Sequence, residues 1–344
     1  MNALVLEDAK KFAFREVDRP ELATDRDVLV RVKAVGICGS DVHGMDGSTG
    51  RRRPPIIMGH EASGVIETVG AAVRDFHPGQ RVTFDSTMWC GECYYCRSGR
   101  VNLCDHRRVL GVSCEEYRQD GAFAEFVVVP DRILFQIPDA LDFVGAALTE
   151  PVAVAAHAAN LTPIERNETL VVVGAGLIGL LLLQVLRSGH SGRIIAVDLD
   201  ASRLELARKL GADEALLATD PDLEARILDL TSGRGADRAF EAVGATAPIK
   251  TALSLVRKGG SLTLIGNLSP KIELPLQTVV TRELTLYGSC AIAGEYPLAL
   301  DLMARRKLDY AAVVSAVRPL SEGAGWFDRL YNREPGLLKV VLEP

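Results

Sequence analysis

The sequence lacks any long tract of proline, serine or one sign of charge, and 24% of its 344 residues are charged against 48% that are hydrophobic. Disordered chains combine few apolar residues with a high net charge, so this chain is expected to fold. Its length exceeds what one hydrophobic core usually supports. We therefore expect a globular protein of about two domains.

Positive charge is also scarce, because 39 lysines and arginines stand against 45 aspartates and glutamates, which leaves a net charge of -6. Proteins that bind nucleic acid neutralise phosphates with clustered Lys and Arg, so a nucleic-acid partner is not expected. Residues 1–12, MNALVLEDAKKF, have acidic and basic residues in their first apolar patch and no small-residue cleavage site. They do not have the pattern of a signal peptide, and the expected location is the cytoplasm.

One uncharged run, TLVVVGAGLIGLLLLQVL at 169–186, has the eighteen residues that a membrane-spanning helix requires. Its first part, residues 171–173, consists of consecutive valines, which are typical of a strand buried on both faces of a parallel sheet. Gly174, Gly176 and Gly179 then interrupt the run. The pattern therefore predicts a strand, a tight turn and a helix, and no membrane span.

The chain after this turn alternates between strand and helix patterns. A second strand, predicted at 193–197, ends at Asp198, and an amphipathic helix follows from 201 until Gly211 stops it. The further apolar runs that alternate with helical patterns lie at 238–242, 261–265 and 283–287. Together these elements predict a doubly wound parallel sheet.

The sequence on either side of this region is different in character. Short β-type runs at 28–35 and 62–69 alternate with Gly and Pro, which predicts a β-rich, barrel-like domain. Beyond a helix predicted at 296–306, the chain reaches LLKVVLE at 337–343, a strand pattern too short to fold alone. We expect this last strand to join the N-terminal domain.

The motif Gly-x-Gly-x-x-Gly at 174–179 follows the first predicted strand and opens a predicted helix, and Asp198 stands nineteen residues after Gly179 at the end of the next strand. This context is typical of a dinucleotide-binding turn. Gly174 permits the tight turn, Gly176 lets the backbone approach a pyrophosphate at the helix N-terminus, and Gly179 allows close helix packing.

Asp198 is expected to accept hydrogen bonds from the adenosine ribose, and its carboxylate would repel a 2′-phosphate, so the sequence favours NAD over NADP. Arg203 on the next helix could bind a 2′-phosphate, so NADP stays an alternative cofactor. A strand-end aspartate and a helix-surface arginine without a cofactor role are the alternatives. The predicted cofactor-binding residues are Gly174, Gly176, Leu177, Ile178, Gly179, Asp198, Arg203, Ile265 and Gly266.

Four of the seven cysteines, Cys90, Cys93, Cys96 and Cys104, lie within fifteen residues. Four thiolates fill every position of a tetrahedral metal and leave none for water or substrate, so the spacing favours a structural zinc site. An iron–sulfur centre is an alternative, but Cys104 follows after seven residues and precedes Asp105 in place of proline. Disulfide pairing is a third interpretation, which a cytoplasmic protein disfavours.

Two further motifs, CysGlySerAspValHis at 38–43 and GlyHisGlu at 59–61, offer ligands outside this cluster. With the four-cysteine lobe, GluPro at 150–151 and the turn at 174–179, they make the chain resemble the zinc-dependent medium-chain alcohol and polyol dehydrogenases. The resemblance extends over nearly the whole chain, and within the family it points to the branch of the sorbitol and galactitol-1-phosphate dehydrogenases.

The resemblance implies an α/β protein in which a β-rich, GroES-like catalytic domain accompanies a Rossmann domain with a doubly wound parallel sheet. It places the catalytic domain at residues 1–152 and 291–344, with the structural zinc lobe at 88–106, and the NAD-binding domain at 153–290. It also implies a homodimer or homotetramer that binds a small-molecule alcohol.

For the active site, the resemblance implies a catalytic zinc bound by Cys38 and His60, with Glu61 beside it. Alcohol dehydrogenases of the family generally supply a second cysteine where this chain has Glu150, whereas polyol dehydrogenases carry a glutamate there. A catalytic zinc needs about three protein ligands and one open position, so Glu61 and Glu150 are not both expected to bind it while substrate is held. Taken singly, each residue has an ordinary interpretation as a core or surface side chain.

The implied reaction is hydride transfer between a secondary alcohol of a polyol, sugar alcohol or sugar-alcohol phosphate and NAD, with zinc as the Lewis acid. Ser40 and His43 match the family's proton relay from the substrate oxygen to solvent. A turn hydroxyl and a loop histidine without a catalytic role are the alternative interpretations of these two residues.

The substrate is less clearly indicated. Sorbitol dehydrogenases typically have a tyrosine after the relay histidine and an Arg-Tyr pair at the start of the returning segment, whereas this chain has Gly44, Ala291 and Ile292. The loss of these polar groups points away from sorbitol. Arginines 51–53 would suit a phosphorylated sugar alcohol, although such a run is more often a solvated loop. Threonine and vicinal diols stay open as substrates.

Two other functions fit the sequence less well than a dehydrogenase does. A zinc-free quinone reductase is opposed by Cys38, His60 and Asp198. A zinc-ribbon binding protein that presents residues 90–104 to a partner is opposed by the net acidity and the complete dinucleotide motif. About two zinc ions per chain would fit the dehydrogenase, one the ribbon and none the reductase.

Overall fold

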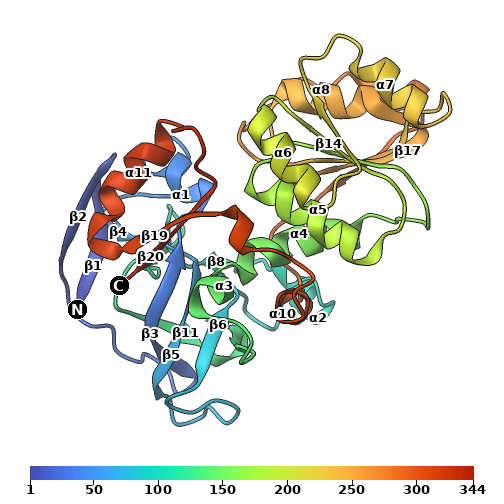
Figure 1. Ribbon diagram of the computed structural model, residues 1–344. Coiled ribbons are helices and arrows are strands. Elements are labelled where there is room, and N and C mark those ends of the chain that lie inside the picture. Colours follow the sequence, from blue (N-terminus) through green and yellow to red (C-terminus); the bar gives the residue numbers. More distant parts are fainter. The chain divides into compact units, whose positions relative to one another are not determined.

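The structure is a computed structural model that describes residues 1–344. The chain divides into two compact units. In Figure 1 the first unit runs from blue through cyan into green and is completed by the red C-terminal segment, and the second unit runs from green to orange. The first unit contains residues 1–153, 292–305 and 310–344, and the second contains residues 154–291 and 306–309.

β-Strands dominate the first unit. They are β1 (Asn2–Asp8), β2 (Lys11–Glu16), β3 (Asp27–Gly36), β4 (Ile56–Ile57), β5 (Glu61–Val69), β6 (Arg81–Phe84), β7 (Thr87–Met88), β8 (Arg108–Val109), β9 (Val112–Ser113), β10 (Arg118–Gln119), β11 (Phe126–Pro130), β12 (Leu134–Gln136), β19 (Val314–Pro319) and β20 (Lys339–Glu343). The largest sheet has the order β12-β6-β5-β3-β20-β19, with β11 also paired to β3, and a smaller sheet has the order β2-β1-β4.

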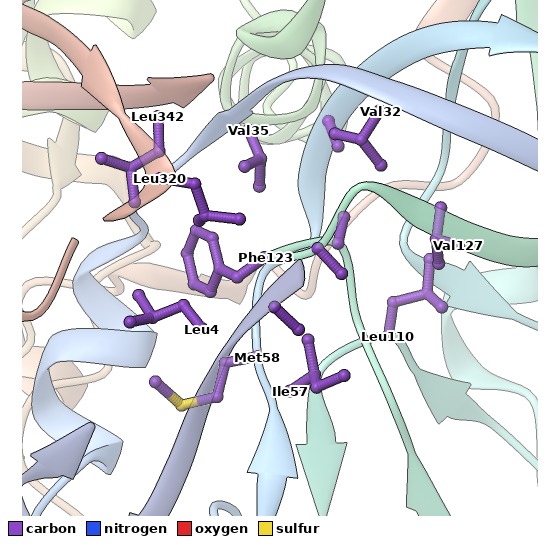
Figure 2. Packing of buried hydrophobic residues seen from close by; sticks show 14 of the residues in the cluster. Leu4, Val32, Val35, Ile57, Met58, Leu110, Phe123, Val127, Leu320 and Leu342 are labelled. Atoms are coloured by element: carbon purple, nitrogen blue, oxygen red, sulfur yellow. The ribbon is translucent and has the colours of Figure 1, made fainter. Parts of the chain in front are cut away.

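Short helices accompany these sheets, namely α1 (Gly39–Gly44), α2 (Tyr94–Arg97), α3 (Phe143–Ala147), α10 (Tyr296–Ala304) and α11 (Gly323–Tyr331), while α4 (Thr149–Leu161) leads into the second unit. In the core, apolar side chains of the strands surround the ring of Phe123, and Figure 2 shows Leu4, Met58 and Leu320 around it. Beside this core, α11 packs against α1, where the Tyr331 hydroxyl donates to Asp46 at 3.0 Å.

The last strand of the chain joins the first unit, as its apolar pattern led us to expect. β20 pairs antiparallel with β3 through Val341 with Gly36 and Leu342 with Val35, and the amide of Ile37 donates to the carbonyl of Val340 at 2.9 Å. The segment that leaves the end of β3 is therefore attached to the C-terminal strand. This segment contains the Cys-x-x-x-x-His motif.

The second unit contains one parallel sheet with the order β15-β14-β13-β16-β17-β18. Its strands are β13 (Leu170–Val173), β14 (Ile194–Asp198), β15 (Glu214–Leu217), β16 (Ala236–Glu241), β17 (Val256–Leu264) and β18 (Thr285–Gly288). Its helices are α5 (Leu177–Gly189), α6 (Ala201–Lys209), α7 (Leu223–Leu230), α8 (Thr246–Leu255) and α9 (Leu276–Thr281). The chain extends the sheet from β13 to one side and then returns to its other side at β16, so the carboxyl ends of these two strands form a switch point, where such sheets bind ligands.

The uncharged run at 169–186 is divided between β13 and α5, as the valine and glycine pattern predicted. All four residues of β13 are buried, and α5 has thirteen residues. The structure contains no helix of the length and apolar character needed to cross a bilayer.

Candidate active site and metal centres

The candidate catalytic group lies where β3 and β5 come together. Gly36 at the end of β3 pairs with Glu61 at the start of β5, so the residues just beyond these strand ends, Cys38 and His60, meet at one edge of the sheet. Glycine at 36 leaves room for the carboxylate of Glu61, because a Cβ there would lie 2.3 Å from Oε2 of Glu61.

The sulfur of Cys38, a ring nitrogen of His60 and a carboxylate oxygen of Glu61 lie within 4.8 Å of one another. His60 and Glu61 are buried, and Cys38 is partly exposed. Thiolate, imidazole and carboxylate are the ligands that zinc takes in proteins, and three of them leave one position open, as a catalytic site requires. These donors therefore fit a catalytic zinc.

Buried acidic groups outnumber buried cations around these donors. The cations are Arg52 and Lys339, and the buried carboxyls are those of Asp41, Glu61, Asp85 and Glu150. Burial raises the pKa of Glu150 to about 8, His60 opposes the shift and the charge of Glu61 adds to it. Burial likewise raises the pKa of Asp85 to about 6, although the backbone of Thr87 donates to it. Buried charge must be compensated, so a divalent cation suits this surplus of carboxylates.

Lys339 is the buried counter-charge of Glu61. Its Nζ lies 2.5 Å from Oε2 of Glu61 and also donates to the carbonyl of Ile37 at 2.8 Å. Burial opposes a charged lysine, but Glu61 and Cys38 raise the pKa of Lys339 above its usual value. The sequence analysis did not single out Lys339, although a lysine inside an otherwise apolar strand was the available signal.

Glu150, near the start of α4, lies outside the group of three mutually close donors. It is nevertheless near enough for the charges of His60, Glu61 and Lys339 to act on its carboxyl. The structure thus brings Cys38, His60 and Glu61 together and places Glu150 in the surrounding shell of charge. Whether Glu61 or Glu150 is the zinc ligand is not decided by this arrangement and stays a prediction.

Both residues of the predicted proton relay lie on α1, directly after Cys38. Ser40 and His43 are exposed. Burial of part of the imidazole lowers the pKa of His43, the charge of Arg333 lowers it further, and Asp46 opposes the shift. A lowered pKa keeps the ring neutral near pH 7, which is the form that accepts a proton.

The four clustered cysteines form a second, separate group whose sulfurs all lie within 4.8 Å of one another. The Sγ atom of Cys90 is 3.9 Å from that of Cys96 and 3.6 Å from that of Cys104. Zinc–sulfur bonds of about 2.3 Å at tetrahedral angles place sulfurs about 3.8 Å apart, whereas a disulfide needs about 2.05 Å. All seven cysteines are free, so the spacing fits a metal and not disulfide pairs.

Backbone amides point at these sulfurs from within the same loop. Cys93 donates to Cys90 at 3.4 Å, Cys96 to Cys93 at 3.5 Å, and His106 to Cys104 at 3.3 Å. Such N–H donors stabilise the thiolate form, which is the form that binds metal. Four thiolates fill a tetrahedral shell, so this group fits a structural zinc.

In the second unit, the three glycines of the turn differ in what surrounds them. Gly174 has a φ of +97°, and a Cβ there would lie 2.6 Å from Val243. A Cβ at Gly179 would lie 1.8 Å from the carbonyl oxygen of Gly174, which shows how closely α5 packs on the turn. At Gly176 a Cβ would meet nothing within 4 Å. The backbone at 176 is therefore open to a ligand.

Gly176 is also the N-cap of α5 and has no side chain that could cap the helix. The first N–H groups of a helix lack partners within it and favour an anion, so this end suits a pyrophosphate. Leu177 and Ile178 form the first turn, and both are partly exposed. The cofactor roles of these residues stay predictions.

The other predicted cofactor residues lie beyond the carboxyl ends of neighbouring strands. Asp198 ends β14 and accepts from the amide of Ala175 at 2.6 Å, which fixes its carboxylate beside the glycine turn. Ile265 and Gly266 follow β17, and both amides donate to the carbonyl of Glu241. Arg203 lies on α6 in reach of the carboxylate of Asp200, at 3.7 Å. Since β13, β14 and β17 belong to one parallel sheet, all these residues share its carboxyl edge.

The three consecutive arginines have different surroundings. Arg52 is buried, and its guanidinium is 2.8 Å from the carboxylate of Asp41. The expectation that all three arginines could meet a substrate phosphate is therefore wrong for Arg52. Arg51 and Arg53 instead line an open hollow of about 650 Å³ together with Arg107 and Arg108. The alternation arises because residues 51–53 lie extended beside Ser113.

Two family profiles match the chain. The family profile "Alcohol dehydrogenase GroES-like domain" matches residues 24–139, and the profile "Zinc-binding dehydrogenase" matches residues 178–305. The D-arabitol-phosphate dehydrogenase of Enterococcus avium is 34% identical over 97% of this chain and 94% of its own length. The sorbitol dehydrogenase of Bacillus subtilis is 33% identical over 100% of this chain and 97% of its own length.

Solved structures are similar over the whole chain. A zinc-binding dehydrogenase from Sinorhizobium meliloti 1021, bound to NADP, has a TM-score of 0.91 at 33% identity and covers 100% of this chain and 99% of its own. An alcohol dehydrogenase from Escherichia coli CFT073, complexed with NADH, has a TM-score of 0.90 at 29% identity, with the same coverage.

A GroES-like unit with two groups of zinc-type donors and a Rossmann unit with a dinucleotide turn define a medium-chain, zinc-dependent dehydrogenase. The chain belongs to the zinc-type alcohol dehydrogenase family. It is an oxidoreductase whose cofactors are zinc and a nicotinamide dinucleotide.

Metal content and stability should separate the two zinc groups. The protein should hold about two zinc ions per chain. Cys38→Ser should lose one of them and lower kcat by at least about 100-fold, because Lewis acidity contributes several kcal/mol, while the thermal midpoint changes little. Cys96→Ser should lose the other zinc and lower the thermal midpoint, while the folded fraction keeps its kcat. The reverse pattern in zinc analysis, melting curves and initial rates would refute the assignment.

The same zinc analysis, after dialysis against a chelator, distinguishes the two glutamates. Lys339 already engages the carboxylate of Glu61, so Glu150→Gln should lower the retention of the catalytic zinc more than Glu61→Gln does. Equal retention in the two variants would show that Glu150 is not the ligand.

Proposed function

We propose that the protein oxidises a secondary hydroxyl of a polyol or sugar alcohol with NAD and catalyses the reverse reduction. The donor set supports this proposal most directly, because it contains Cys38 as its only cysteine and has a second buried glutamate, Glu150, beside it. In the family that the chain resembles, this combination is typical of the polyol dehydrogenases. Two relatives named for a sugar alcohol or its phosphate, at 34% and 33% identity, favour the same class.

In this proposal, Cys38 and His60 hold the catalytic metal together with Glu150 or Glu61. When bound, zinc polarises the substrate hydroxyl and the dinucleotide accepts the hydride. The hydroxyl group of Ser40, on the first turn of α1, would accept the proton that the substrate loses while it passes its own proton on along the relay. His43 lies one turn further along the same helix and is exposed, so it can transfer that proton to solvent.

We further propose a homodimer or homotetramer in the cytoplasm. β18 is an edge strand of the parallel sheet, and the helix before it exposes Leu276 and Val280, which together suit a subunit contact. Seven free cysteines suit a reducing compartment. Sedimentation analysis would count the subunits, and a monomer at micromolar concentration would contradict this part of the proposal.

A substrate screen tests the proposed reaction. Formation of NADH should be fastest with polyols and sugar alcohols, because a donor set with Cys38 as its only cysteine and Glu150 beside it is typical of the polyol dehydrogenases of the family. Threonine, vicinal diols and, for the reverse class of reaction, quinones with NADPH serve as comparisons. A kcat/KM for threonine or a simple diol at least about tenfold above every polyol would contradict the proposal, since that ratio corresponds to 1.4 kcal/mol.

The hollow beside Arg51 and Arg53 favours a second candidate substrate, a sugar-alcohol phosphate. Its lining includes four arginines, and charge-assisted hydrogen bonds to a phosphate contribute about 1.5–3 kcal/mol each. The lining also contains Asp105, Glu115 and Glu116, and Glu115, which is 3.4 Å from Arg53, would have to give way to the phosphate.

If the phosphate binds there, the double variant Arg51→Gln, Arg53→Gln should raise KM for the phosphorylated alcohol by about 10–100-fold, which follows from those energies. The KM for the matching free alcohol should not change, so the free alcohol is the control. An equal change for both substrates, measured by initial rates, would remove phosphate recognition from the hollow.

Cofactor preference should depend on the carboxylate of Asp198. Asp198→Ala should lower kcat/KM for NAD and raise the NADP to NAD ratio of kcat/KM by at least about tenfold, because it removes a ribose acceptor and the repulsion of a 2′-phosphate. Asp237→Ala is the matched control, since Asp237 accepts from the amide of Thr169 at 2.8 Å, at the amino ends of β13 and β16, and should affect stability alone. An unchanged ratio in Asp198→Ala would contradict the assignment of NAD.

A further inference from the structure

A fully buried carboxylate lies behind the proposed zinc ligand His60. Asp41, on α1, has no exposed surface, and its Oδ2 atom is 3.4 Å from Nδ1 of the His60 ring. Neither of these two atoms makes a hydrogen bond in the structure, so the 3.4 Å approach between them is the nearest polar contact of each. Because Nδ1 faces Asp41, Nε2 is the ring nitrogen left for the neighbouring donors of Cys38 and Glu61. The ring thus presents Nε2 to the metal donors and Nδ1 to Asp41.

Arg52 fixes the other oxygen of the same carboxylate. Its Nε and Nη2 atoms both donate to Oδ1 of Asp41, at 3.2 and 2.8 Å, so Oδ2 remains directed at the imidazole. Arg52 is itself only 4% exposed, and its Nη1 atom donates to the carbonyl of Arg51 at 3.0 Å. A buried carboxylate without such a cation would be strongly destabilised or would take up a proton.

The absence of a side chain at residue 44 makes room for this arginine. A Cβ at Gly44 would lie 2.5 Å from Cγ of Arg52 and 3.5 Å from its Cβ. Gly44 does not have a positive φ, so the backbone does not by itself require glycine there. The requirement comes from Arg52. Any side chain at 44 would therefore force Arg52 out of this position.

We propose that Arg52 is a positioning residue for the catalytic metal, acting through Asp41 on His60. The lack of a side chain at Gly44 leaves the space that Arg52 occupies. This inference rests on the proposed function, because it takes His60 to be a zinc ligand. A carboxylate hydrogen-bonded to the second ring nitrogen of a ligating histidine sets its tautomer and orientation, and loss of such a partner lowers metal affinity by about 10–100-fold. Without Arg52, Asp41 loses the bonds that orient it.

Release of zinc from the purified holoenzyme tests the proposal independently of turnover. Arg52→Met should release one of the two zinc ions to a chelator about 10–100-fold faster than the natural protein, while the zinc at the four cysteines is released at an unchanged rate. Arg52→Lys, which keeps the charge but loses the paired geometry, should release this zinc at a rate between those of the natural protein and Arg52→Met. In cobalt(II)-substituted protein, Arg52→Met should also alter the visible spectrum of the catalytic ion.

Gly44→Ala tests the same contact while Arg52 stays in the sequence. It should accelerate zinc release in the same direction, and the double variant Gly44→Ala, Arg52→Met should be no faster than Arg52→Met alone, because both changes act on one contact. Additive effects of the two substitutions would overturn the role assigned to Gly44.

Arg238→Met is the matched control for stability. Arg238 makes a similarly buried two-point ion pair, with Glu168 at 2.8 and 3.0 Å, but in the second unit. It should lower the thermal midpoint without changing release of either zinc. If Arg52→Met behaves like Arg238→Met, Arg52 has a structural role only and the inference is wrong. If the natural protein binds only the four-cysteine zinc, the proposed function itself fails, which is a distinguishable result.

Discussion

The active-site side of the first unit depends on one buried ion pair, between Lys339 and Glu61. Each side chain is 1% exposed, and they are 278 residues apart in the chain. Burying two charges is favourable only when each is fully paired, and Lys339 meets that condition with a second bond to the carbonyl of Ile37. The same lysine thus neutralises Glu61 and fixes the backbone that precedes Cys38.

Features that arise within a short stretch of sequence could be predicted. The glycine turn at 174–179 combines three glycines whose separate reasons, a positive φ, an open approach and a tight packing contact, all follow from local spacing. The four cysteines form one group because a short loop brings them together. The parallel sheet could be predicted as well, since its strands are buried on both faces and carry continuous apolar runs.

Features that depend on contact between distant segments could not be predicted. Asp41 and Arg52 are ordinary charged residues in the sequence, and only the fold shows that they face each other behind His60. Arginines 51–53 read as one exposed run, yet the middle side chain points inward because an extended segment alternates its faces. Lys339 lies in a predicted strand, but the sequence around it does not indicate that Glu61 is its partner.

The pairing of β20 with β3 has a consequence for the order in which the molecule is made. Synthesis reaches Glu61 early and Lys339 only after the entire parallel-sheet unit, because that unit is inserted between them. Until the last strand is translated, Glu61 has no buried cation and the sheet edge that carries Cys38 lacks its neighbour. The centre that would hold the catalytic metal thus cannot be complete until the cofactor-binding unit has been translated.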